Sequence, residues 1–158
     1  MIRNILTLLF VITSQFLFAQ SYPYSINKKK YPLGDDFDKI MPQKIGEWKR
    51  FSFHDFVIGG ETGTVYYRKN DKQVFVSFGK AYSQENLQSA WIKMYDDVMG
   101  KSKTKSAKIS THSSKNIKYI YLQSTYNQYL AWTRNLYFFS IQTKHKSDAD
   151  EFMKIFPY

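Results

Sequence analysis

The side chains best suited to catalysis or metal binding are three histidines, and they lie far apart in the sequence, at His54, His112 and His145. A zinc site usually takes ligands that are grouped within a few residues or share one face of a helix, and these positions offer neither. His54 and Asp55 could form an oriented general base. However, adjacent side chains on an extended segment point to opposite sides of it. The histidines therefore predict neither a metal site nor a catalytic site.

Hydroxyl, carboxylate and glycine patterns give no stronger signal for an enzyme. The sequence has no Gly-x-Ser-x-Gly turn that would present a nucleophilic serine. The carboxylate pairs Asp35-Asp36 and Asp96-Asp97 fit a helix start and an exposed helix face better than the paired acid and base of a glycosidase. The glycine-rich segment 56–63 lacks the Gly-Lys-Ser/Thr of a nucleotide-binding loop, so it predicts a bend between strands. We therefore expect no catalytic residue and no cofactor.

Two groups of residues are better suited to binding a partner. Four lysines within eight residues form the densest positive patch, interleaved with serine and threonine. On the later part of the chain, tyrosines and a tryptophan mingle with basic residues, and exposed tyrosines on a sheet suit sugar rings or a protein partner. The candidate residues for binding an anion or a partner are Lys101, Lys103, Lys105, Lys108, Tyr119, Tyr121, Trp132 and Arg134. Alternatively, the lysines belong to a solvated linker and the tyrosines reflect the preference of strands for this residue.

The first nineteen residues have the three features of a cleavable export signal. Arg3 supplies the positive start, 5–17 is mostly apolar, and Ala19 is a small residue at the expected cut. Polar side chains interrupt the apolar stretch before it is long enough to span a bilayer, so cleavage is favoured over a retained anchor. The chain contains no cysteine, which excludes lipid attachment and disulfides. The sequence thus predicts an exported protein, periplasmic or extracellular, with no transmembrane anchor after cleavage.

The charge of the chain indicates an anionic partner. Removal of Arg3 with the signal lowers the formal net charge from +10 to +9. Such a balance favours membrane headgroups, acidic glycans or an acidic protein, and the export signal disfavours nucleic acid. We expect a non-enzymatic binding or accessory domain whose partner is a protein or an anionic envelope component. The alternatives are an inhibitor or immunity-type protein against an exported enzyme and a small secreted hydrolase.

The elements that must position these residues follow from periodicity and helix caps. Tyrosine, valine and phenylalanine dominate 64–69 and 73–79, and the polar pair between them is typical of a hairpin turn. Segment 83–99 repeats apolar residues at helical spacing, begins at the capping residue Ser83 and ends before Gly100. Helices are expected at 35–41, 83–99 and from Ser147 to Pro157, and strands at 49–54, 64–69, 73–79, 108–112, 116–125, 129–133 and 136–143, with one bent strand over 129–143 as the alternative.

Strands joined by tight turns imply antiparallel pairing, and helices in the middle and at the end imply cover on a single face. The predicted fold is α+β, with an antiparallel sheet of about five to six strands and one face covered by a main helix, a C-terminal helix and a short N-terminal helix. The predicted organisation is a signal peptide at 1–19, a loose N-terminal arm at 20–34 and a single globular domain at 35–158. The two-residue period of a strand predicts that Val74 and Val76 face the core and that Phe75 lies on the other side.

Overall fold

The structure is a computed structural model that describes residues 22–30, 32, 36–57, 60–101, 107–114, 117–125 and 127–158. The predicted export signal lies outside these ranges. The helices are η1 (Pro23–Lys28), α2 (Phe37–Ile40), α3 (Gln84–Lys101) and α4 (Lys146–Ile155). The strands are β1 (Lys44–Ile45), β2 (Trp48–Val57), β3 (Gly60–Lys69), β4 (Lys72–Ala81), β5 (Lys108–Ser113), β6 (Ile117–Gln123), β7 (Gln128–Arg134) and β8 (Tyr137–Thr143). Among the described residues, no helix combines the length and the apolar character needed to cross a bilayer.

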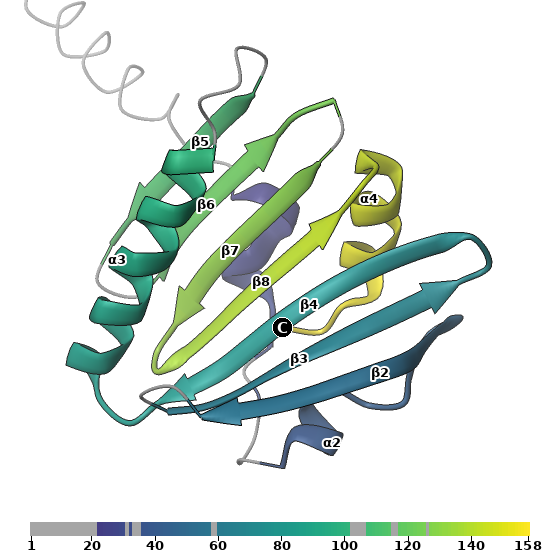
Figure 1. The fold of residues 1–158 in the computed structure, drawn as a ribbon, viewed down its shortest axis with the longest axis horizontal. Helices are drawn as coiled ribbons and strands as arrows, with labels where there is room; N and C mark the ends of the chain where they lie inside the picture. Colours follow the sequence, from purple (N-terminus) through teal and green to yellow (C-terminus); the bar gives the residue numbers. More distant parts are fainter. Residues whose placement is uncertain are drawn as a thin grey trace, which may run out of the picture.

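The strands form one antiparallel sheet, which confirms the α+β prediction (Figure 1). Its order across the described residues is β1-β2-β3-β4-β8-β7-β6-β5, so it has eight strands and the predicted number of five to six is wrong. The short β1 pairs with β2, and 129–143 is divided between β7 and β8. The division occurs at Asn135, whose φ of 51° is one that asparagine tolerates better than most residues. Asn70, with a φ of 54°, makes the corresponding turn between β3 and β4.

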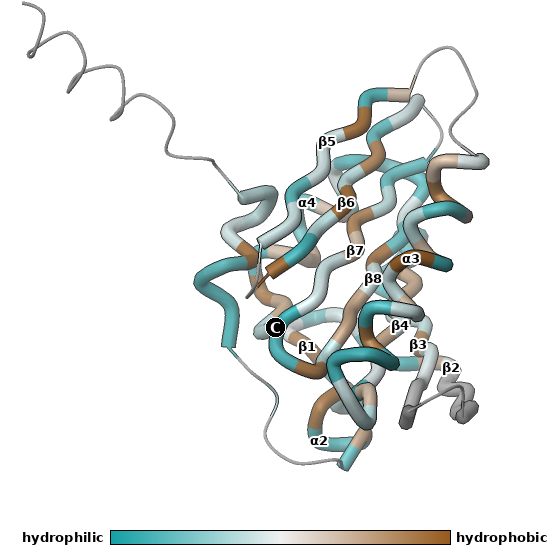
Figure 2. Tube along the Cα trace, turned by 90° about the vertical axis from the view of Figure 1, so that its left-hand side faces the viewer, coloured by the Kyte–Doolittle hydropathy of each residue, from teal (hydrophilic) through white to brown (hydrophobic). Residues whose placement is uncertain are grey.

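Helices cover both faces of the sheet, which corrects the prediction that they share one face. Figure 1 shows α3 in front of the sheet beside β5 and β6, with α4 behind it, and Figure 2 shows the sheet from the side. The cause is that β6 is apolar on both sides. Ile117 and Tyr119 join the core beneath α4, whereas Ile120 and Leu122 join a second core beneath α3.

The larger core lies between the sheet and α4. Phe152 of α4 packs edge-on against Trp48, with ring centroids 5.4 Å apart, and stacks on Phe156 at 5.3 Å. Trp132 and Phe139 stack from neighbouring strands at 5.3 Å. Such aromatic pairs add about 0.5–1.5 kcal/mol each beyond the apolar area that they bury. A few large rings therefore hold together a chain that has no disulfide.

The smaller core lies under α3 and involves only one half of the sheet. Its buried residues are Trp91, Val98, Ile120, Leu122 and Ala131. They come from α3, β6 and β7, and the partly buried Ile109 of β5 extends the contact to the sheet edge. On the same face, β2, β3 and β4 have no helix in front of them (Figure 1).

Residues 22–30 pack against the sheet, contrary to the prediction of a loose arm at 20–34. Ile26 is fully buried in the larger core. The Lys29 ammonium donates to the backbone oxygens of Met153, at 2.6 Å, and Phe156, which lie at the end of α4. A cation at a helix C-terminus stabilises carbonyls that lack partners within the helix. The run of lysines suggested a solvated segment, but one of them anchors the segment to α4.

Candidate partner-binding face

The aromatic residues predicted to bind a partner lie on the face that α4 and η1 cover. Trp132 is fully buried and Tyr119 is 4% exposed. Tyr22 packs edge-on against Tyr119, with ring centroids 5.9 Å apart, and Tyr24 does the same against Tyr121 at 5.9 Å. The prediction of an exposed surface at these positions is therefore corrected, because the N-terminal segment occupies that surface.

Arg134 also serves the N-terminal segment. Its guanidinium donates to the backbone oxygen of Ile26, at 3.3 Å, and to that of Lys29. The Ile26 carbonyl also accepts from the backbone N–H of Lys29, so Arg134 bonds to the last turn of η1 and to the residue that follows it. The structure thus gives Arg134 a role in holding η1 on the sheet.

The lysine patch is only partly described. Lys101 ends α3, and Lys108 begins β5 with an exposed side chain. Lys103 and Lys105 lie outside the described residues. The two described lysines therefore mark the ends of the connection between α3 and β5, and the predicted anion-binding patch stays a prediction.

Polar groups on the η1 side bond to one another. The Tyr24 hydroxyl donates to Asp150 at 2.9 Å and lies 3.3 Å from the hydroxyl of Tyr121. Burial and these bonds raise the pKa of Tyr24. Burial opposes ionisation of Asp150, but donation from Lys146 at 2.7 Å and from Tyr24 outweighs it and lowers the pKa of this carboxyl. The group therefore fastens η1 to α4 and β6.

The histidines do not gather into one site. His112 lies under η1, where its Nε2 is 3.2 Å from the Tyr22 hydroxyl, and His145 precedes α4. The side chain of His54 lies outside the described set, although its backbone pairs with Thr64. Across the described ranges, no three histidine, aspartate or glutamate side chains are grouped so as to hold a metal ion.

The half of the sheet that α3 leaves uncovered carries an aromatic row. Tyr66 pairs with Phe75, and the register continues through Gln142 to Tyr129, which packs against the core under α3. This continuity places Tyr66 and Phe75 on the α3 side of the sheet. It confirms the prediction that Phe75 faces away from the main core. The ring centroids of Tyr66 and Phe75 are 4.7 Å apart, in an edge-on arrangement.

Phe51 extends the row onto β2. Its ring centroid lies 5.6 Å from that of Tyr66, and its side chain is 48% exposed. The Arg68 guanidinium lies over the Phe51 ring, with Cζ 4.3 Å from the centroid. Lys49 pairs with Arg68 in the register of β2 and β3. We define the open face by Lys49, Phe51, Tyr66, Arg68, Phe75 and Gln142.

The cations of the open face form no salt bridge among the described residues, unlike those at the adjacent sheet end, and the nearby Glu47 is paired with Lys69. Lys69 and Lys72 form salt bridges with Glu151, which lowers the pKa of this carboxyl to about 2. Lys49 and Arg68 are exposed, and in the described part of the chain neither forms a salt bridge. The open face therefore presents uncompensated positive charge beside its aromatic rings.

Two shallow hollows adjoin the aromatic row. The first, of about 470 Å³, is lined by Phe51, Arg68 and Lys49 together with Glu47, Lys69 and Asn70. The second, of about 650 Å³, lies beside Tyr66, Phe75 and Gln142. The rings thus stand between a basic hollow and a polar hollow. Sequence reasoning missed this face because it concentrated on the later strands, and the placement of Phe75 was the one signal that pointed to it.

Comparison with known proteins establishes the fold alone. No protein-family model matches the chain, and no curated protein matches it. The structure is similar to the crystal structure of a GTP binding regulator from Thermotoga maritima, with a TM-score of 0.57 and 15% sequence identity. The similarity covers 77% of this chain and 83% of the other. At that identity, the likeness shows a shared arrangement of helices and strands.

Proposed function

We propose that the chain is exported, loses residues 1–19, and acts outside the cytoplasm as a non-enzymatic domain that binds an acidic protein through its open face. The observation that carries this proposal is the aromatic row of β2, β3 and β4, with Arg68 stacked on its exposed end and no acidic partner. An enzyme inhibitor, the alternative drawn from the sequence, would use the same face, with the enzyme as its partner.

The composition of the open face matches the centre of a protein interface. Aromatic residues and arginine are enriched there, and they supply most of the binding energy when a partner excludes water from them. The rings of Phe51, Tyr66 and Phe75 are also held by one another, so little side-chain entropy remains to be lost on binding.

The charge of the open face favours a partner with a carboxylate. Arginine that stacks through its flat surface on an aromatic ring keeps the N–H groups at its edge, which match a carboxylate in a two-bond arrangement. Arg68 has this placement over Phe51. Lys49 adds a second positive charge beside it, and the net charge of the chain would speed the encounter with an acidic surface.

The test separates the contribution of the open face to binding from the contribution of the net charge of the chain. Immobilised poly-glutamate serves as a simple acidic polypeptide, and the salt concentration that elutes each variant is measured. The double variant Lys49→Glu/Arg68→Glu should elute at lower salt than the control Lys93→Glu/Lys154→Glu, which has the same net charge and changes exposed lysines on α3 and α4. Equal elution of the two double variants would show that charge alone governs binding and would refute this face as the docking site.

Phe51→Ala tests the aromatic part of the proposal. Because the side chain is half exposed but packs against Tyr66 and Arg68, its removal should lower the free energy of unfolding by about 1–2 kcal/mol and leave the chain folded. Elution should nevertheless shift to lower salt, since Arg68 loses the ring that orients it. Tyr82→Ala is the matched control, because Tyr82 is 68% exposed and lies outside the open face.

A further inference from the structure

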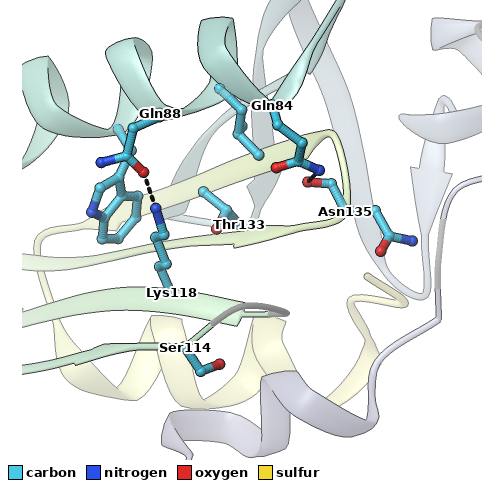
Figure 3. Close-up of a pocket in the computed structure, with 8 residues that line it drawn as sticks. Gln84, Gln88, Ser114, Lys118, Thr133 and Asn135 are labelled. Atoms are coloured by element: carbon cyan, nitrogen blue, oxygen red, sulfur yellow. Dashed lines mark hydrogen bonds between the residues drawn. The ribbon is translucent and has the colours of Figure 1, made fainter.

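A separate small pocket lies on the same side of the sheet, beneath the first turns of α3 (Figure 3). Its volume is about 140 Å³. One wall is α3, with Gln84 and Gln88, and the floor is formed by Lys118 of β6 and Thr133 of β7. None of the residues that define the open face lines this pocket.

The positive charge at this pocket is not neutralised. The Lys118 ammonium donates to the side-chain oxygen of Gln88, which is an uncharged acceptor (Figure 3). Within the described ranges, no carboxylate forms a salt bridge with Lys118. The bond from this ammonium to the amide is already charge-assisted, but a carboxylate would add the attraction of an opposite charge, which an amide oxygen lacks.

Thr133 adds a hydroxyl to the lining of the pocket. The residue is 4% exposed, and Figure 3 shows its side chain at the pocket between α3 and the sheet. Among the described residues, none forms a hydrogen bond with the Thr133 hydroxyl. The Thr133 hydroxyl is not one of the fully buried polar atoms without a partner, so it is open to the pocket and can bond to a ligand there.

We propose that this pocket binds a small organic monoanion through its carboxylate, which lies between the Lys118 ammonium and the Thr133 hydroxyl. One ammonium neutralises one negative charge. Leu87 and Trp91 line the pocket as well, and their apolar surfaces suit a short hydrocarbon tail. The volume equals roughly that of four or five water molecules in the liquid, at about 30 Å³ each, which suits a carboxylate with a few carbons.

The pocket can be probed with sodium butyrate in solution. The experiment uses the ¹⁵N-labelled chain from residue 20 and follows the three indole N–H signals by NMR. Saturable movement of the Trp91 signal is expected, because this ring lines the pocket. The Trp48 and Trp132 signals should stay in place, because both rings are buried in the core on the other side of the sheet.

Neutral and inorganic probes define the chemistry of the site. n-Butanol has a similar tail without the charge, and it should bind about tenfold more weakly, the factor expected for one charge-assisted hydrogen bond. Inorganic phosphate tests for anion binding that needs no tail. Equal affinity for butanol, equal affinity for phosphate, or no saturable movement of Trp91 with butyrate would each overturn the proposal.

Two variants test the named groups. Lys118→Met should weaken butyrate binding about tenfold or more, while Lys93→Met, on the exposed side of α3, should leave it unchanged. Thr133→Val removes the unpaired hydroxyl at nearly constant volume, so it should weaken binding without lowering the midpoint of urea unfolding. Butyrate binding that survives both substitutions would refute the assignment of Lys118 and Thr133.

Discussion

Substitution of Ile26 by alanine tests whether the N-terminal segment is part of the folded domain. Ile26 is fully buried among residues of the sheet and α4, although it precedes the first strand by many residues. Truncation of a buried isoleucine to alanine costs about 2–5 kcal/mol, from lost apolar burial and from the cavity left behind. The tight packing beneath α4 leaves little room for collapse. We therefore expect Ile26→Ala to lower the free energy of unfolding by about 3 kcal/mol.

Urea unfolding followed by tryptophan fluorescence measures this loss. Trp48 and Trp132 are fully buried in the core that Ile26 joins, so their emission reports the same transition. The midpoint should fall while the slope of free energy against urea stays constant, as for a pure loss of stability. Ile92→Ala is the control, because the same atoms are removed from a residue of α3 that is 50% exposed. Its effect should be within about 0.5 kcal/mol.

If the free energies of unfolding of Ile26→Ala and Ile92→Ala differ by less than about 0.5 kcal/mol, the conclusion that Ile26 is part of the core is refuted. Such a result would mean that residues 22–30 do not stabilise the sheet in solution. The covered tyrosines of β6 would then be available to a partner, as the sequence first suggested. A large loss of stability would show that residues 22–30 stay packed on their side of the sheet. It would therefore support the open face as the surface that is available to a partner.

Two further predictions concern single interactions. The pKa of Glu151 is lowered from 4.5 to about 2 by its two lysine partners, so its contribution to stability is complete above pH 4.5 and is lost as the pH falls toward 2. Glu151→Gln should flatten the acid limb of a plot of unfolding midpoint against pH, and an unchanged limb would contradict this role. Gly46 has a φ of 58°, and a Cβ there would lie 2.8 Å from Cδ1 of Ile155. Gly46→Ala should cost about 1–2 kcal/mol for the backbone conformation alone. Thermal unfolding measures this loss of stability. Adding Ile155→Val, which shortens the neighbouring side chain, should restore only the part of the stability that is lost to the steric clash. Full restoration would show that the backbone at residue 46 is unstrained.

The local structure of this protein was largely predictable from neighbouring residues. The Ser83 hydroxyl accepts from the backbone N–H of Asn86 at 3.1 Å, as expected of a helix cap. Asp36 caps α2 through the backbone N–H of Lys39 in the same way. The hairpin of β3 and β4 also follows the prediction, with its turn at Asn70. Caps, turns and strand alternation depend on residues a few positions apart, so their signals survive in the sequence.

Which side of the sheet is covered was decided by contacts between distant parts of the chain. Alternation in β6 and β7 showed that two sets of side chains face opposite ways, but both sets are rich in apolar and aromatic residues. The tyrosines of β6 became buried because η1 lies over them, held by Arg134 across more than a hundred residues. The rings of β2, β3 and β4 remained open because α3 crosses the other half of the sheet.

By itself, the sequence determined most of the strand and helix segments, though not η1 or β1, together with the antiparallel class of the sheet and the face on which Phe75 lies. The tertiary structure alone decided that Arg134 anchors a backbone segment and that Arg68 stacks on Phe51 with no acidic partner among the described residues. The physical reason is that an arginine carries the same charge and the same hydrogen-bond donors whether it anchors a backbone segment or lies on an exposed ring. Only the groups that folding brings within a few ångströms determine whether those donors are already used.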